Sequence, residues 1–192
     1  IATPHFCAET ESVEHFLSRR EKSFQVLQKE MSFGLPKVLL GAEVQYYPGI
    51  SQLKNIKSLC IEGTSLILLE MPFSDWTEYT VREVIKLAHS GSVTVILAHV
   101  ERYLSFQNKS VWKRFSESGI LMQVNASFFL QMKTKRKALQ MLKYAEIRFV
   151  GSDCHNTASR PPRIGEAIDV IRKKFGEQFV FQMQEYGYSL LS

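Results

Sequence analysis

The sequence predicts an α/β protein built on a parallel sheet, either a barrel or an open sheet. Short apolar runs alternate with longer segments of helical periodicity along the chain. The apolar runs are nearly continuous, which is typical of strands buried on both faces of a parallel sheet. No internal repeat, low-complexity tract or Pro/Gly linker divides the 192 residues, so we expect a single domain.

The strands are predicted from six apolar runs, which are bounded by Gly, Pro or polar residues. The chain opens on what look like the last residues of one strand, and five further runs follow. In chain order they are Ile1–Thr3, Lys37–Val44, Ser65–Met71, Ser92–His99, Ile120–Asn125 and Ile147–Ser152.

The helices are predicted from stripes of apolar residues at helical spacing between these runs. The stripes are Val13, Phe16, Leu17, Phe24 and Leu27; Val81, Val84, Ile85 and Ala88; Val111, Trp112 and Phe115; Ala138, Leu139 and Leu142; and Ile164, Ala167, Ile168 and Ile171. Asn108 is a suitable N-cap for the third helix, which should stop at Gly119, and Gly176 should end the fifth.

The composition is that of a globular protein, with 45% hydrophobic, 22% charged and 11% aromatic residues. It excludes a disordered or collagen-like chain. No run approaches the ~18 apolar residues of a membrane span, so we expect no membrane insertion. The 3 cysteines, Cys7, Cys60 and Cys154, lie far apart, which favours a reducing cytoplasm over a disulfide scaffold. The net charge of +5 fits an anionic substrate or partner without requiring nucleic acid.

Residue types that bind metals lie at the predicted strand ends, where parallel α/β folds form their sites. His5 follows the first strand, Glu43 lies near the end of the second and His99 ends the fourth. Asp153 and His155 follow the sixth strand. Imidazoles together with carboxylates suit Zn, Mn or Fe, and a carboxylate can bridge two ions. The sequence therefore predicts a metal centre at this rim of the sheet.

Two arginines accompany these candidate ligands. Arg102 lies three residues after His99, and Arg160 lies five residues after His155. A guanidinium group matches phosphate oxygens with two parallel hydrogen bonds. Metal ligands and two arginines on one rim point to a phosphate ester as the substrate.

Four other polar residues are assigned less direct roles. Glu70 and Asn125 also end strands. We expect Glu70 to be structural or to support the ligands, and whether Asn125 points at the site stays open. His15 and His89 fall inside helical patterns, so we assign them to the surface or to packing.

Five short segments together resemble a known family. They are Ala2-Thr3-Pro4-His5, Gly41-Ala42-Glu43-Val44, Ala98-His99-Val100-Glu101-Arg102-Tyr103, Gln123-Val124-Asn125-Ala126, and Ser152-Asp153-Cys154-His155-Asn156 with Arg160-Pro161. In this order they resemble the polymerase-and-histidinol-phosphatase (PHP) superfamily, and within it the CpsB/CapC-type bacterial tyrosine-protein phosphatases. The resemblance covers most of the chain.

The resemblance implies a distorted (β/α)7-type barrel with a cluster of two or three metal ions, manganese first and iron or zinc as alternatives. It implies metal binding by His5, Glu43, His99, Asp153 and His155, and phosphate binding by Arg102 and Arg160. In that scheme His5 and His155 share one ion and Glu43 bridges two, with His99 on the second and Asp153 on another.

The resemblance also implies an activity and a partner. Such enzymes remove phosphate from tyrosines, typically in the tail of a bacterial tyrosine kinase that controls capsule or exopolysaccharide export. Histidinol phosphate and other small phosphomonoesters are alternative substrates within the superfamily. The sequence leaves the oligomeric state open, with a homo-oligomer as one outcome.

The chain departs from the family pattern near its start, where Phe6-Cys7-Ala8 replaces the usual polar continuation after His5. The family opens with an Asp-x-His-x-His strand that supplies two metal-binding histidines, and this segment does not occur here. We therefore expect residues 1–192 to form a single PHP-like phosphatase domain that is incomplete at its N-terminus, with the first strand–helix unit missing or truncated. A non-catalytic binding or scaffold protein of a polysaccharide-export complex is the alternative.

Two further patterns suggest rival functions. Residues 154–160 fit Cys-x5-Arg, the phosphate loop of cysteine-dependent phosphatases, in which backbone amides hold phosphate while a thiolate attacks. The loop has no Gly, and Asp153 beside Cys154 disfavours a thiolate. Residues 133–137 form a basic run without the interleaved aromatic residues of a nucleic-acid site, so we interpret it as a solvated helix face.

Overall fold

A computed structural model describes residues 1–32, 34–144 and 146–191. A six-stranded parallel sheet lies at its centre, and neighbouring strands follow chain order from β1 to β6. Sequential parallel order is the winding of a β/α barrel, whereas a doubly wound sheet reverses its strand order. The strands are β1 (His5–Phe6), β2 (Glu43–Gln45), β3 (Leu66–Glu70), β4 (Thr94–Leu97), β5 (Leu121–Asn125) and β6 (Phe149–Gly151).

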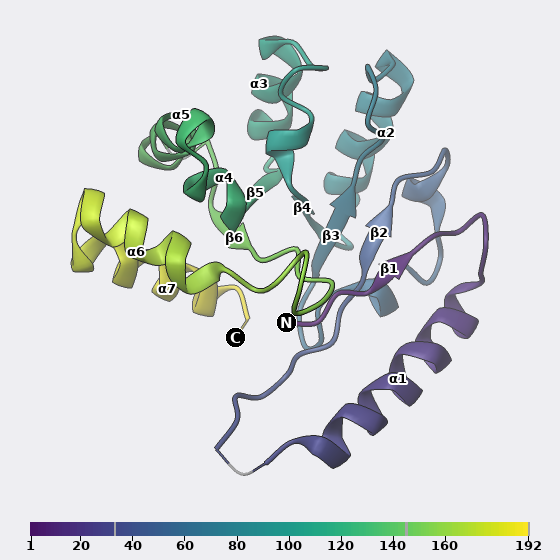
Figure 1. The fold of residues 1–192 in the computed structure, drawn as a ribbon. Coiled ribbons are helices and arrows are strands. Elements are labelled where there is room, and N and C mark those ends of the chain that lie inside the picture. The colour runs from purple at the N-terminus through teal and green to yellow at the C-terminus, as the bar shows by residue number, and fades with distance from the viewer. Residues whose placement is uncertain (33, 145, 192) are drawn as a thin grey trace.

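The helices surround the outer face of the curled sheet, which forms a half-barrel (Figure 1). They are α1 (Val13–Glu30), α2 (Glu78–Ala88), α3 (Lys109–Glu117), α4 (Ala126–Leu130), α5 (Met132–Lys143), α6 (Ile164–Phe175) and α7 (Glu177–Ser189). Short 3₁₀ helices occur at η1 (Ile50–Gln52), η2 (Ile56–Leu59) and η3 (Val100–Arg102). The α/β barrel class predicted from the sequence is therefore confirmed.

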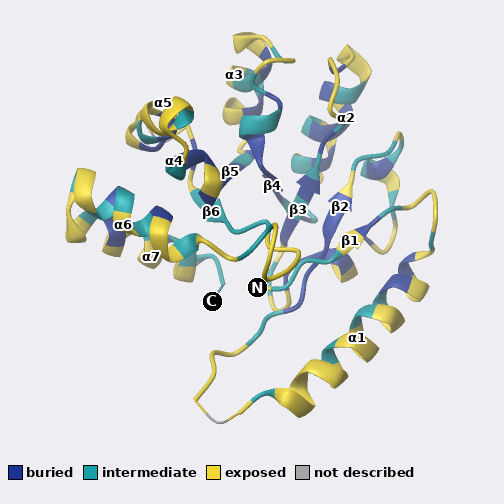
Figure 2. Ribbon diagram, in the orientation of Figure 1, coloured by how far each residue is buried: buried dark blue, intermediate teal, exposed yellow. Residues whose placement is uncertain are grey.

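Alternate residues of the strands separate two hydrophobic layers. In β3, Ile67 and Leu69 belong to the large cluster beneath the helices. Leu66, with Leu68 packed beside it, belongs to a smaller cluster on the inner face of the sheet. This period of two is the geometry of a strand. Figure 2 shows most of β3, β4 and β5 in the dark blue of buried residues at the centre, whereas the helices carry much of the yellow of exposed residues.

The first two strands lie later in the chain than predicted. Ala2 and Leu40 form only an isolated parallel bridge, and the continuous ladder starts at His5 and Glu43. The cause is Pro4, which accepts a hydrogen bond from the Glu43 amide but has no N–H to donate. His5 therefore lies within β1, rather than beyond the end of a strand at Ile1–Thr3.

The other four strands and all five predicted helices are confirmed. The Asn108 side chain caps α3 by accepting hydrogen bonds from the amides of Ser110 and Val111. Gly176 ends α6 with a φ of 88°, which favours glycine. The structure adds α4 and α7, which the sequence patterns did not predict.

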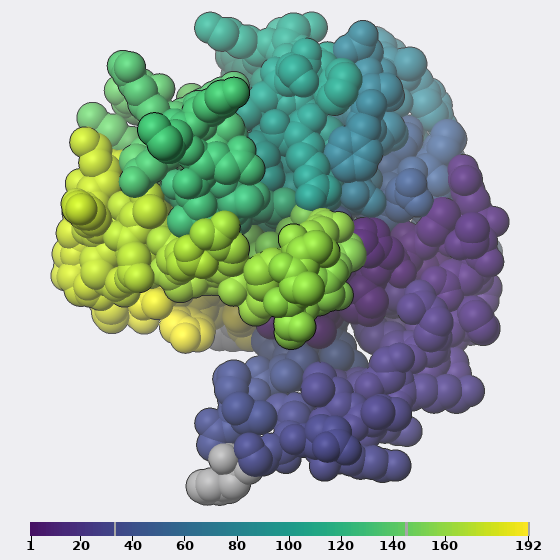
Figure 3. Space-filling view, in the orientation of Figure 1, coloured from purple at the N-terminus to yellow at the C-terminus, as the bar shows by residue number. Residues whose placement is uncertain are grey.

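Helix α1 lies apart from the other helices, and the segment after it projects below the body of the molecule (Figure 3). The buried residues of α1 are Val13 and Phe16, both in its first half, while Val26 and Leu27 are exposed. Within the described residues, no helix has the length and apolar character needed to cross a membrane.

Candidate active site

The register of the sheet brings two candidate ligands onto its inner face. His5 of β1 is paired with Glu43 of β2, and Glu43 is paired with Leu68 of β3. Residues aligned across parallel strands point to the same face, and Leu68 packs in the inner hydrophobic cluster. His5 and Glu43 therefore face the hollow of the half-barrel, and their Nε2 and Oε1 atoms are 3.9 Å apart.

Two more residues, Glu70 at the end of β3 and His99 after β4, lie close to Glu43. Glu70 follows Leu66 and Leu68 at the inner-face period of two. His99 follows β4 and has a φ of 33°, a left-handed conformation that is strained for a residue other than glycine. Its Nε2 atom lies 3.0 Å from Oε1 of Glu43 and 3.2 Å from Oε1 of Glu70.

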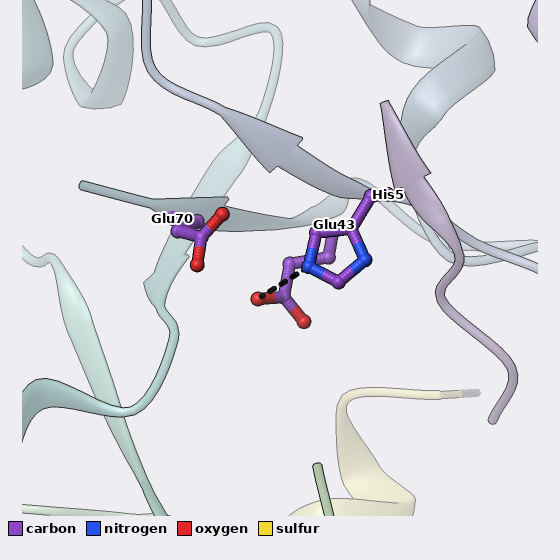
Figure 4. A group of neighbouring side chains, drawn as sticks. All are labelled: His5, Glu43 and Glu70. Carbon is purple, nitrogen blue, oxygen red and sulfur yellow. Dashed lines mark ion pairs between the residues drawn. The ribbon is translucent and has the colours of Figure 1, made fainter. Parts of the chain in front are cut away.

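The donor atoms are close enough to share a cation. His5, Glu43 and Glu70 each offer one ligand atom, and these three atoms lie within 4.8 Å of one another (Figure 4). Glu43 and His99 are buried, with exposed fractions of 7% and 1%. Two carboxylates directed at one buried point repel each other unless a positive charge lies between them. The chemistry of this donor set therefore fits a divalent metal ion.

Among the protein groups at this point, His99 supplies a positive charge. Burial alone would lower the pKa of its imidazole, but hydrogen bonds to Glu43 and Glu70 outweigh burial and raise the pKa to about 9. The same hydrogen bond from His99 lowers the pKa of Glu70. The proton on His99 thus balances the charge of the Glu43 and Glu70 carboxylates, as a metal ion would. Binding of a metal ion by His99 would release this proton.

His99 is held in place through both its ring and its backbone amide. Its Nδ1 atom lies 3.1 Å from the hydroxyl of Tyr103, and that hydroxyl accepts a hydrogen bond from the Met71 amide at 3.0 Å. The side-chain oxygen of Gln123 accepts a hydrogen bond from the His99 amide at 3.3 Å. Partners of this kind fix the orientation and tautomer of a metal-binding histidine.

Gly151 leaves space for the side chain of Gln123, which holds the His99 amide. A Cβ atom at Gly151 would overlap the side-chain amide of Gln123. Gly151 is the last residue of β6, beside Asn125 at the end of β5. A side chain at position 151 would therefore displace the residue that holds the His99 backbone.

A second group of charges centres on Asp153, just after β6. Arg102 and Arg160 both form ion pairs with Oδ2 of Asp153. The Asn125 side chain donates a hydrogen bond to the same oxygen at 2.9 Å. Burial acts to raise the pKa of Asp153, but the positive charges of the two arginines outweigh it and lower the pKa.

His155 joins the two groups. Its Nδ1 atom lies 3.6 Å from Oδ1 of Asp153, and its ring centroid is 5.4 Å from that of His5. Figure 3 shows the yellow-green segment after β6 against the purple N-terminal segment.

The backbone of Asp153 has a positive φ of 51°. With His99, it is one of the two non-glycine residues of positive φ in the described chain, and such strain clusters at functional sites.

Two adjoining cavities open over these groups. A cavity of about 1100 Å³ is lined by all five predicted metal ligands, namely His5, Glu43, His99, Asp153 and His155. A smaller cavity of about 430 Å³ is lined by Arg102 and Arg160. Asp153 and Asn125 line both cavities. A ligand held by the arginines would therefore lie beside the histidine and carboxylate cluster.

The Cys-x5-Arg loop has a different geometry from a phosphate loop. The side-chain oxygen of Asn156 accepts hydrogen bonds from the amides of Ala158, Ser159 and Arg160, at 2.9, 2.7 and 3.1 Å. Donors engaged in this way are not free to hold a phosphate. The thiol of Cys154 makes a weak contact of 3.7 Å with the Asn156 carbonyl oxygen. The loop therefore supports the arginine and not a cysteine nucleophile.

The structure brings all seven residues singled out from the sequence to one rim, and their roles as ligands and phosphate contacts stay predictions. For Glu70 the structure differs from the expectation of a structural or supporting role, because Glu70 lies inside the cluster with His5 and Glu43. Asn125 points at the site. His15 of α1 lies outside it and pairs with Glu11, which precedes that helix. The supporting side chains of Tyr103 and Gln123 were not singled out, although both lie in the segments that carry the family resemblance.

Comparisons with known proteins agree on one family. The family described as capsular polysaccharide synthesis, CpsB/CapC, matches residues 1–186. YwqE of Bacillus subtilis, a tyrosine-protein phosphatase, is 29% identical over 197 residues, covering 100% of this chain and 77% of the relative. The tyrosine-protein phosphatase CpsB of Streptococcus agalactiae is 28% identical over 175 residues, covering 84% of this chain and 71% of the relative.

A solved structure is also similar. It comes from work on YwqE of Bacillus subtilis and CpsB of Streptococcus pneumoniae, described as unique metal-dependent tyrosine phosphatases. The match has a TM-score of 0.81 and 26% sequence identity, and it covers 100% of this chain and 79% of that chain. The likeness thus extends over the whole half-barrel.

Proposed function

This chain belongs to the capsular polysaccharide synthesis family CpsB/CapC, and we propose that it is a metal-dependent tyrosine-protein phosphatase. One observation carries the proposal. The inward-facing cluster of histidines and carboxylates adjoins two arginines, and Asp153 is part of the wall of both cavities. This is the juxtaposition that hydrolysis of a phosphate monoester needs, with metal-type ligands on one side and phosphate-binding groups on the other.

The proposed metal ligands are the five predicted from the sequence together with one added by the structure: His5, Glu43, His99, Asp153, His155 and Glu70. Their mixture of imidazole nitrogens and carboxylate oxygens suits manganese, with iron or zinc as alternatives. When bound, such ions lower the pKa of a coordinated water and neutralise charge on phosphoryl oxygens. Support comes from the carboxylates of buried Glu43 and partly buried Glu70, which both contact Nε2 of His99.

Arg102 and Arg160 bind the phosphoryl group in this proposal. Their guanidinium groups both reach one carboxylate oxygen of Asp153, which shows that they converge on a single anionic oxygen. Phosphate offers more such oxygens, in the geometry that a guanidinium fork matches. Because charge on these oxygens changes during phosphoryl transfer, the two arginines also stabilise the transition state.

Other residues of the chain hold the groups in position. Tyr103 and Gln123 orient His99 through its ring and its amide. Asn125 holds Asp153 through the side-chain amide. Strained conformations at His99 and Asp153, costing of order 1–3 kcal/mol each, persist because these contacts fix them. The site is thus preorganised before any substrate arrives.

The proposed substrate is a phosphotyrosine protein, in particular the tail of a bacterial tyrosine kinase that controls capsule or exopolysaccharide export. Support comes from the tyrosine-protein phosphatases among the relatives and from the capsular polysaccharide synthesis family itself. The net charge of +5 favours an anionic phosphopeptide. We further propose that residues 1–192 act as a single domain in the cytoplasm, where Cys7, Cys60 and Cys154, unpaired in the structure, would stay reduced.

The test combines metal content with hydrolysis. The purified protein is treated with a chelator, its metal content is checked by elemental analysis, and it is assayed on a phosphotyrosine peptide, a phosphoserine peptide and histidinol phosphate. We expect chelation to abolish phosphotyrosine hydrolysis and added manganese to restore it. Activity that survives verified metal removal would refute the metal mechanism. A metal-loaded protein that hydrolyses none of the three substrates would favour the scaffold alternative.

A further inference from the structure

Phe73 is an exposed aromatic residue at the edge of the active site. It lies on the loop after β3, three residues beyond Glu70, and 52% of it is exposed. Other large hydrophobic residues are also exposed, but the ring of Phe73 contacts the proposed catalytic groups. An exposed aromatic residue in contact with the groups of a binding site is a candidate ligand contact.

The Phe73 ring lies near both a proposed metal ligand and a proposed phosphate contact. It is nearly parallel to the His99 ring, with an interplanar angle of 14° and 5.9 Å between centroids. Its centroid lies 5.4 Å from that of Tyr103. The guanidinium carbon of Arg102 lies 5.9 Å from the centroid of Phe73. The ring is thus close to the phosphate position while half of the residue remains exposed.

The loop that carries Phe73 is fixed on both sides of it. The Trp76 indole donates a hydrogen bond to the Pro72 carbonyl at 2.9 Å, and the Gln107 side chain donates to the Ser74 carbonyl at 2.8 Å. The Met71 amide is held by the Tyr103 hydroxyl. A ring on an anchored loop loses little conformational freedom when a ligand stacks on it, which favours binding.

We propose that Phe73 forms the subsite for the aromatic ring of the substrate and makes the site selective for aryl phosphates. This inference rests on the function proposed above. In phosphotyrosine a single ester oxygen joins the ring to phosphorus, so a phosphoryl group held by Arg102 carries its ring close to Phe73. Aromatic pairs favour offset or edge-to-face contact. Phosphoserine and phosphothreonine have no ring, and they gain nothing from this residue.

The chain offers a matched control. Phe181 on α7 is the same residue type with the same exposed fraction, 52%. Among the described residues, the ring contacts of His99, Tyr103 and Arg102 involve Phe73 and not Phe181. Phe181→Ala should therefore remove an equally exposed ring without changing the recognition of aryl phosphates.

The experiment measures binding of two non-hydrolysable probes, phenylphosphonate and methylphosphonate, by calorimetry on metal-loaded protein. We expect Phe73→Ala to weaken phenylphosphonate by about 2- to 12-fold, the range that one aromatic pair provides. Methylphosphonate affinity should be unchanged, and Phe73→Tyr should restore the preference. For phosphotyrosine peptide hydrolysis, Phe73→Ala should raise KM by a similar factor with little change in kcat. Phe181→Ala should change none of these quantities.

The possible outcomes separate the subsite from the proposed function. Equal weakening of both probes by Phe73→Ala would show that the ring merely supports His99 or Arg102, which overturns the inference. Unchanged affinities would overturn it too, as would a wild-type protein without preference for the phenyl probe. If Phe73→Ala does not fold, Phe73→Leu keeps the apolar bulk and should still lose the preference. A wild type that prefers the phenyl probe yet hydrolyses no phosphotyrosine would leave the subsite standing and refute the function.

Discussion

Replacing Cys154 by serine and Arg160 by alanine, in separate variants, distinguishes the metal route from a cysteine nucleophile. In the metal route the thiol has no chemical role, so Cys154→Ser should keep most of the activity. Arg160→Ala removes one of the two guanidinium groups that meet at Asp153 and should be much worse. A cysteine route predicts loss in both, because a serine hydroxyl stays protonated and is a far poorer nucleophile.

The expected sizes follow from the contacts in the loop. Cys154 is exposed and its thiol makes one weak contact, so its replacement should lie within about 0.5 kcal/mol, or about 2-fold in rate. A hydrogen bond to a charged group contributes about 1.5–3 kcal/mol, which is roughly 10- to 150-fold in rate when expressed in the transition state. Because 40% of the Arg160 side chain is exposed, we expect the lower part of that range.

The assay is kcat/KM on a phosphotyrosine peptide with metal-loaded protein, together with metal content and a folding check by circular dichroism. Arg172→Ala is the control for loss of a guanidinium, since Arg172 pairs with Asp169 and Glu177 on the outer helices. If Cys154→Ser is inactive while its metal content and fold are intact, the metal mechanism is wrong. The loop of residues 154–160 would then be the catalytic one.

Three further predictions concern the metal cluster. His99→Ala and Glu43→Ala should each reduce the rate by orders of magnitude, and a near-normal rate with unchanged metal content would contradict their roles. Glu70→Gln keeps the shape but removes a charge, so it should lower the manganese content in elemental analysis, whereas Glu62→Gln on the surface should not. In the metal-free protein, His99 has its pKa raised to about 9. Its contribution to the free energy of unfolding is fully present below about pH 6.5 and is lost as the pH rises through about 9. Urea titrations in chelator at pH 6 and pH 9.5 test this, and equal stability at both values would refute it.

The location of the site was predictable from the sequence because strand ends of a parallel sheet share one rim. The predicted runs at β4, β5 and β6 end where the structure places His99, Asn125 and Asp153. The position of β1 was not predictable in the same way. Pro4 interrupts the ladder locally, and only the pairing of His5 with Glu43 shows where it resumes.

Glu70 shows the limit of interpreting an apolar run as uniformly buried. The run Ser65–Met71 is predicted to be a strand covered on both faces, which leaves Glu70 without a defined direction. Its period of two was already present: Leu66, Leu68 and Glu70 share one face. The sequence does not show that this inner face is apolar at Leu66 and Leu68 but meets the polar cluster of His5, Glu43 and His99 at Glu70.

The two missed helices have local causes. Helix α4 has only 5 residues, too few to show a helical period. Helix α7 contains Gly187, and an interior glycine lowers helix propensity by about 1 kcal/mol. Packing of Phe179 and Met183 against the core stabilises α7, and such contacts do not follow from local sequence.

The charge balance of the site explains why its two halves adjoin. Glu43 and Glu70 face the cationic His99, so these three groups carry one excess negative charge. Asp153 faces two guanidinium groups, so these three carry one excess positive charge, and the two halves offset each other. A metal ion would take the place of the His99 proton, and a phosphate would compete with Asp153 for the arginines. Asp153, freed from the arginines, would then be available to the adjoining cluster through the cavity that both halves share. In the proposed function the same carboxylate would serve either half, and its positive φ of 51° is a conformation that clusters at functional sites.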